Sequence, residues 1–217
     1  PQPTLALDSA TASSSQQIKL RVNFAATSKA SGSGTVQMQF KPATGLADDA
    51  TVMFLPSGRL QTVTVREGES IGRFSSSDSI TFQTGTTAGQ IVFTIQMGGY
   101  TSQATLTISP AAVTLDQVRA TRESGRVVVQ LIGYDNTRTA DQLSFTFYDA
   151  TNRFLGSGAL RVSAGTDFQK YFQSATAGGS FNLVATFPVT GNVSTIASVD
   201  VSVTNSAGTT QAPRATF

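Results

Sequence analysis

The acidic side chains are the first residues of this chain that could do chemistry. Two carboxylates that face one cleft can hydrolyse a glycosidic bond when they lie about 5 to 9.5 Å apart. Among the 13 acidic residues only Asp48 and Asp49 are adjacent. Neighbouring residues of a strand point to opposite faces, whereas in a turn they cap the backbone. We therefore predict a pair of turn residues here and no glycosidase site.

The same acids could bind calcium, which takes about six to eight oxygen ligands and is often held by loops. Asp48 with Asp49, or Asp135 with Asp141, could join backbone carbonyls around an ion. No Asp-x-Asp-x-Asp-Gly series supports either pair. We predict no cofactor, and calcium at one of these two pairs is the alternative.

The chain has no His, Cys or Trp. Nucleophilic catalysis therefore lacks two of its usual residues, His and Cys. Without His a serine nucleophile has no common base, and without Cys there is no disulfide and no thiolate metal site. Lys170 shares strand parity with Phe168 and Phe172, and we interpret it as a strand-end residue whose amine reaches water. The alternative is a Lys–Asn isopeptide crosslink with Asn205. We predict that the chain is not an enzyme.

Exposed aromatic rings are the surfaces on which sugar-binding modules stack their ligands. Tyr148 directly follows Phe147, which has the parity of a buried strand residue, so we predict that Tyr148 faces outward. Tyr134 is the second candidate. A tyrosine more often buries its ring and leaves its hydroxyl wet, so a glycan site at these residues is the alternative hypothesis.

Nucleic acid and membrane binding have weaker support. Arg119, Arg122 and Arg126 form the best basic group, but Glu123 lies among them and the net charge is only +2. Aromatic side chains, which single-stranded nucleic acid would need between the basic ones, are missing there. No apolar run approaches the roughly 18–20 residues of a membrane helix. We predict no nucleic-acid partner and no membrane span in this segment.

The elements that must position these side chains are β-strands, because the dominant hydrophobic period is two. β-branched and aromatic residues, which favour strands, fill the alternating positions. Gly98-Gly99 suits a two-residue hairpin turn. No window of a dozen residues keeps a helical spacing. The alternating runs lie at residues 18–24, 36–40, 91–95, 104–108, 127–131, 143–147, 181–187 and 199–203.

The alternation breaks near Pro110 and restarts at Val113. Each half then holds about seven or eight strands, the number in an Ig-like sandwich of about 100 residues. We predict an all-β chain of two tandem Ig-like β-sandwich domains, residues 1–110 and 111–217, and a single large barrel is the alternative. The chain opens Pro-Gln-Pro without a leader sequence, so we expect it to be a segment of a longer protein.

Seven turn-rich motifs, three in the first half and four in the second, carry a family resemblance through their order along the chain. They are Phe40–Asp49, Phe54–Arg59 and Ile80–Gly89 in the first half, and Gly133–Arg138, Phe145–Phe147, Gly178–Phe181 and Val203–Thr209 in the second. Together they resemble a tandem Ig-like pair near the ends of large secreted or surface proteins of soil bacteria, acidobacteria especially. The resemblance implies a β-sandwich fold, an extracytoplasmic location and neighbouring domains, and it brings no catalytic residue.

Composition and resemblance together favour a structural role. Only 13% of the residues are charged, against 39% hydrophobic residues. This low charge, together with many Ser, Thr and Gly residues, favours an extracellular location. We predict a non-enzymatic spacer or adhesion region of a bacterial secreted or surface protein, with protein or glycan ligands. The alternative is a carbohydrate-binding accessory module of a secreted hydrolase.

Overall fold

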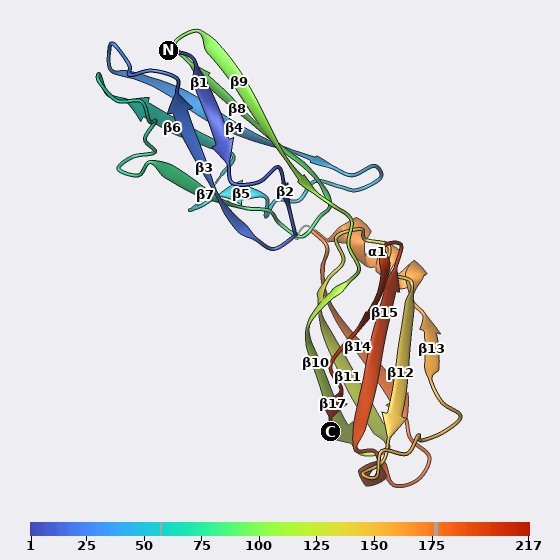
Figure 1. Ribbon diagram of the computed structural model, residues 1–217. Coiled ribbons are helices and arrows are strands. Elements are labelled where there is room, and N and C mark those ends of the chain that lie inside the picture. Colours follow the sequence, from blue (N-terminus) through green and yellow to red (C-terminus); the bar gives the residue numbers. More distant parts are fainter. Residues whose placement is uncertain (57, 176–177) are drawn as a thin grey trace. The chain divides into compact units, whose positions relative to one another are not determined.

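The chain folds into two compact units. The structure, a computed structural model, describes residues 1–56, 58–175 and 178–217, so Ser57 of the second motif lies outside the described residues. Unit 1 comprises Pro1–Ser109, and unit 2 comprises Pro110–Ala175 and Gly179–Phe217. Strands dominate both units (Figure 1), and the predicted all-β class with two sandwich domains is confirmed. The division falls one residue before the predicted boundary.

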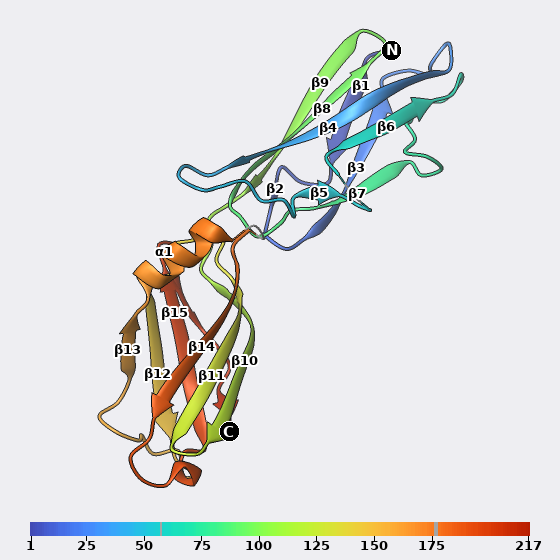
Figure 2. The same cartoon turned by 180° about the vertical axis from the view of Figure 1, so that it is seen from behind.

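Unit 1 is a sandwich of two sheets in the described residues. The four-stranded sheet has the order β1 (Pro3–Leu7), β3 (Gln17–Phe24), β7 (Ser79–Gln83), β5 (Met53–Phe54). The five-stranded sheet has the order β2 (Thr11–Ala12), β9 (Tyr100–Ile108), β8 (Gly89–Met97), β4 (Gly32–Pro42), β6 (Leu60–Val65). The views from both sides place β6 at the outer edge of its sheet (Figure 2).

The predicted alternation fills the core of unit 1. Along β3 the side chains of Leu20, Val22 and Phe24 are buried, while the residues between them are not. The Phe93 ring from one sheet packs edge to face on Phe82 of the other, with centroids 4.8 Å apart. The Gly98-Gly99 turn that joins β8 to β9 has positive φ at both residues, as predicted for a two-residue hairpin.

Unit 2 is also a two-sheet sandwich in the described residues. One sheet has the order β10 (Thr114–Glu123), β11 (Arg126–Tyr134), β14 (Ser180–Pro188). The other has the order β13 (Leu160–Ser163), β12 (Gln142–Tyr148), β15 (Ser198–Asn205), β16 (Gly208–Gln211), and β17 (Ala215–Thr216) pairs with β15. A short 3-10 turn, η1, spans Val193–Thr195. The two sheets meet at Phe145 and Phe187, whose rings contact edge to face at 4.8 Å.

One segment of unit 2 is helical where a strand was predicted. Helix α1 spans Gly165–Ser174 and buries Phe168 and Phe172. A spacing of four residues fits both a strand, where every second residue shares a face, and a helix, where i and i+4 do. Tyr171 is a further aromatic residue at i+3 from Phe168, and this spacing favours a helix. Among the described residues, no helix has the length and the apolar run that a membrane crossing requires.

Candidate functional site

A buried carboxylate organises one end of unit 2. Asp135 follows β11 directly and is fully buried. Its Oδ1 accepts hydrogen bonds from the N–H of Thr137 at 3.0 Å, from the Thr137 hydroxyl at 2.7 Å and from Asn205 Nδ2 at 2.8 Å. Its Oδ2 accepts from the N–H groups of Thr139 and Ala140 at 2.7 and 2.6 Å. These donors replace the water that a carboxylate loses on burial.

Asn205, at the end of β15, connects this carboxylate to the first residues of unit 2. Its Nδ2 also donates to the carbonyl of Ala111 at 2.9 Å, and its Oδ1 accepts from two N–H groups of the turn that follows it. Asn136 Oδ1 accepts from the N–H of Ala111 at 3.0 Å. Both backbone polar groups of Ala111 are thus bound by side chains. We call Asp135, Asn136, Thr137, Thr139 and Asn205 the Asp135 cluster, and residues 110–113 the leading segment.

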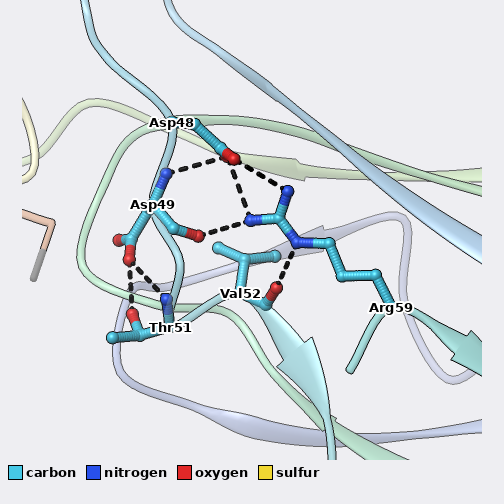
Figure 3. A network of polar contacts seen from close by, with 5 residues as sticks. All are labelled: Asp48, Asp49, Thr51, Val52 and Arg59. Carbon is cyan, nitrogen blue, oxygen red and sulfur yellow. Dashed lines mark hydrogen bonds and ion pairs between the residues drawn. The ribbon is translucent and has the colours of Figure 1, made fainter. Parts of the chain in front are cut away.

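Unit 1 has a comparable buried carboxylate. Asp49 lies in the loop after β4 and is fully buried. Its Oδ1 accepts from the N–H and the hydroxyl of Thr51 at 2.9 and 2.5 Å (Figure 3). Its Oδ2 accepts from the N–H of Thr86 at 2.8 Å and from the Thr87 hydroxyl at 2.9 Å. Asp49 therefore ties the loop after β4 to the loop between β7 and β8.

The neighbouring Asp48 has a different partner. Arg59, directly before β6, places its two terminal nitrogens 2.9 and 3.0 Å from the two carboxylate oxygens of Asp48 (Figure 3). Arg59 also donates to the carbonyls of Val52 and Asp49. The hydrogen bonds from Arg59 hold the pKa of Asp48 below its ordinary value. The prediction that Asp48 and Asp49 are turn caps is confirmed, and Arg59 is the guanidinium that joins them to β6.

Tyr148 does not face outward as predicted, since it is only 8% exposed. Its strand parity is opposite to that of Phe147, but the face it occupies is covered. Arg214 lies 3.8 Å over its ring and Phe154 lies beside it at 5.2 Å between centroids. The Tyr148 hydroxyl donates to Asp200 at 2.8 Å. That hydrogen bond raises the pKa of Tyr148, and the stronger hydrogen bonds from Arg214 lower the pKa of Asp200.

The other predicted site residues do not assemble as the hypotheses required. Asp141 is exposed while Asp135 is fully buried, and Tyr134 is a half-buried residue of β11. A calcium ion at Asp49 or Asp135 would have to displace the N–H and O–H donors that surround these carboxylates. Among the described residues, no three His, Cys, Asp or Glu side chains gather as a metal site would require. Calcium binding stays an untested alternative.

The premise of the isopeptide alternative is wrong. Lys170 lies on the exposed side of α1 and not on a buried strand face. Asn205 uses its amide nitrogen to donate to Ala111, Asp135 and Thr137. The lysine is therefore a solvated helix residue, and the asparagine is a member of the Asp135 cluster.

A repeated triplet marks the buried carboxylates, and our reading of the sequence missed it. Asp49 and Asp135 are each followed two residues later by a threonine that donates both its N–H and its hydroxyl to the carboxylate. Asp149 and Thr151 make the same pair in a more exposed loop. The Asp-x-Thr spacing could have identified the turns, because Asp side chains commonly bond the backbone two residues on. It could not have identified Asn205, which is distant in sequence.

Comparison with known proteins gives no family. No family model matches the sequence, and no curated protein matches it. The resemblance to surface proteins of soil bacteria therefore stays a prediction.

Solved structures give only distant similarities. Bovine butyrophilin is 8% identical with a TM-score of 0.28, covering 96% of this chain and 93% of its own. The type II cohesin dyad from the adaptor ScaA scaffoldin of Acetivibrio cellulolyticus is 12% identical with a TM-score of 0.30. That match covers 97% of this chain and 92% of the cohesin dyad. Salmonella alpha-2-macroglobulin reacted with methylamine is 11% identical with a TM-score of 0.34, covering 99% of this chain and 16% of its own. The fold assignment rests on the sheets described above.

Removing the charge of Asp135 should destabilise unit 2. Asp135→Asn turns one acceptor oxygen into an N–H donor that faces other donors, and we expect a loss of about 2–4 kcal/mol in the free energy of unfolding. Urea unfolding followed by the amide NMR signals of unit 2 measures it. Asp149→Asn, in a second Asp-x-Thr triplet that is only half-buried, is the matched control and should cost less. Equal losses for the two variants would contradict the role of burial.

The ion pair of Asp200 with Arg214 predicts a pH dependence. A carboxylate whose folded pKa is lowered stabilises the fold above its unfolded pKa, and that stabilisation disappears as the pH falls through the folded value. The stability difference between the natural protein and Asp200→Asn should therefore be complete at neutral pH and shrink below about pH 4. Tyr148→Phe keeps the ion pair, so its pH profile should follow that of the natural protein. A difference that stays constant down to about pH 2 would rule the ion pair out.

Proposed function

We propose that this chain is a non-enzymatic structural or adhesion module of a bacterial secreted or cell-surface protein, and that it transmits load between flanking segments. The observation that carries the proposal is the way unit 2 holds its own two ends. Its leading segment is bound by side chains at one end of β15, and its last strand pairs at the other end.

The two attachment points of unit 2 lie at opposite ends of one strand. Asn205, the last residue of β15, holds Ala111. At the start of β15, Val199 pairs with Ala215, and Asp200 accepts two hydrogen bonds from Arg214, both at 2.8 Å. An eight-residue strand spans roughly 25 Å. A pull on the two chain ends would load the central ladder of β15 along its length, so that many hydrogen bonds resist together.

Unit 1 pairs its second strand with its last strand in a suitable orientation. β2 pairs in parallel with β9, with Thr11 opposite Thr107 and Ala12 opposite Ile108. Because the strands run in the same direction, a force that separates the two chain ends slides one strand past the other. Such a shear breaks the paired hydrogen bonds at the same time, whereas an antiparallel hairpin pulled at its open end breaks them one by one.

The chemistry of the acids supports a structural role. Asp49, Asp135 and Asp200, which lie in the polar clusters described above, all serve as acceptors for donors of their own unit. Their oxygens are bound by groups that fix loops and chain ends. A general acid or base needs a proton that it can exchange with a substrate, whereas the oxygens of these carboxylates are bound by donors of the protein.

A carbohydrate-binding module is the second candidate, and one pocket favours it. A pocket of about 210 Å³ beside α1 is lined by Asp167, Phe168, Tyr171, Phe181, Asn182 and Leu183. The Tyr171 ring is 44% exposed, and its hydroxyl donates to the carbonyl of Ser180. An exposed ring beside a carboxylate and an amide is the combination that a sugar ring needs for stacking and hydrogen bonding. Tyr171 therefore replaces Tyr148 as the residue to test.

Pulling the whole chain by its ends in a single-molecule force experiment tests the leading proposal. Asn205→Ala releases Ala111 and removes a donor from Asp135, and a loss of about 2 kcal/mol should speed forced unfolding of one unit at least about tenfold. Asn182→Ala, on an exposed position of β14, is the matched control and should leave the unfolding forces unchanged. An unaltered force profile for Asn205→Ala would contradict the load-bearing proposal.

A glycan array tests the second candidate. If the chain is purely a structural spacer, no glycan binds saturably. Under the carbohydrate proposal at least one does, and Tyr171→Ala abolishes that binding while Tyr100→Ala, which removes a ring that is 50% exposed in unit 1, leaves it intact. Saturable binding that depends on Tyr171 would favour the carbohydrate proposal over a purely structural role.

A further inference from the structure

A groove in unit 1 lies between the two sheets of the sandwich. It encloses about 990 Å³ and is lined by β6 of one sheet, by β7 of the other and by the turns beside them. β6 is an edge strand, since its sheet ends there. On the far wall, the short strand β5 pairs with the last two residues of β7, and the N–H of Leu55 donates to the carbonyl of Thr81. The groove therefore runs along a sheet edge that has room for another segment.

The backbone of β6 offers unused hydrogen-bonding groups to this groove. Thr64 exchanges both backbone hydrogen bonds with Arg73, N–H to carbonyl at 2.9 Å and carbonyl to N–H at 2.7 Å, so its polar groups point away from β4. Every second residue of an antiparallel strand has the same orientation. The N–H and carbonyl groups of Thr62 and Leu60 therefore also point away from β4, and among the described residues none pairs with them as Arg73 pairs with Thr64. This short open edge has the groups that an added strand uses.

The side chains of the groove are uncharged. Of the 13 lining residues in the described part of the chain, eight carry a hydroxyl or an amide and five are apolar. Leu60 is 62% exposed and provides an apolar surface at the rim, while Phe74 and Ile80 are buried at the floor. A charged ligand would lose its hydration here without gaining a counter-charge. The lining therefore selects a neutral ligand with alternating polar and apolar groups.

An extended peptide fits these features better than a sugar does. The groove has one aromatic residue, Phe74, and it is only 7% exposed, so no ring is presented for stacking. The backbone groups of Leu60 and Thr62 could form up to four main-chain hydrogen bonds with a new strand, as in β-strand addition. An exposed edge is also the place where natural proteins often set a charge to prevent pairing, and β6 has none between Leu60 and Val65.

We propose that unit 1 binds an uncharged, extended peptide segment of another protein, which adds to the five-stranded sheet beside β6. The segment has alternating β-branched or small side chains, because those fit a pleated edge and its cross-strand neighbours. Leu60, Thr62 and Thr64 share the exposed face of β6, so the side chains on one face of the segment lie beside all three, and the side chains on its other face point toward the space between the sheets. This site goes beyond the load-bearing role and does not depend on it.

NMR titration of the full chain tests the proposal with three synthetic probes. The first is the acetylated and amidated peptide Gly-Thr-Val-Thr-Val-Thr-Gly. The second is the same peptide with all five central nitrogens methylated, and the third is the neutral sugar cellohexaose. We expect the first peptide to shift the amide signals of Leu60, Thr62 and Ser79 in a saturable manner. Methylation, which removes the main-chain donors, should weaken binding at least about tenfold.

Two variants locate the binding on β6. Thr62→Pro removes the outward N–H, and an edge strand tolerates proline at a position whose N–H faces away from the ladder. It should weaken binding at least about tenfold, whereas Thr62→Val keeps the N–H and should bind like the natural protein. The methylated probe acts on the unaltered protein, so that comparison holds even if Thr62→Pro fails to fold.

Four results would overturn the proposal. They are the absence of any shift by the unmodified peptide, equal affinity of the methylated peptide, shifts of the β6 signals by cellohexaose in place of the peptide, and dimerisation of the chain through β6 in sedimentation experiments.

Discussion

The burial of Asp135 is the constraint on which the end of unit 2 depends. A buried carboxylate must be surrounded by hydrogen-bond donors, because the cost of burying an unpaired charge exceeds what a small domain can sustain. The donors are Thr137, Thr139 and Ala140 in the loop after β11 and Asn205 at the end of β15. Once they do, the loop has one conformation, Asn205 has one orientation, and Ala111 has a fixed acceptor and donor.

The same solution recurs where the sandwich has no ladder to hold its loops. Asp49 joins two loops of unit 1, and Asp200 joins Tyr148 to Arg214 near the last strand of unit 2. The chain has no cysteine. These polar clusters hold separate segments together, as disulfides do in many secreted sandwiches. They place hydrogen bonds to carboxylates at loops and chain ends, which is where a module that bears load requires them.

Much of the fold could be predicted from local pattern, and much of the site could not. The alternation of Leu20, Val22 and Phe24 predicted a strand because burial on one sheet face repeats every second residue. The same reasoning misassigned Phe168 and Phe172, whose spacing suits a helix equally well. It also placed Tyr148 in solvent, because strand parity does not show what a distant loop will cover. The Asp135 cluster was out of reach for a related reason: its partner comes from the far end of the unit's sequence.

Native-state hydrogen exchange of the Ala111 amide tests the central claim, that the buried carboxylate makes the leading segment an integral part of unit 2. The account predicts that Ala111, Thr139 and Ala140 exchange only when unit 2 unfolds as a whole, at the same free energy as the amide of Leu131 in β11. If Ala111 instead exchanges as fast as an open chain while Leu131 stays protected, the segment is not held and the account is wrong.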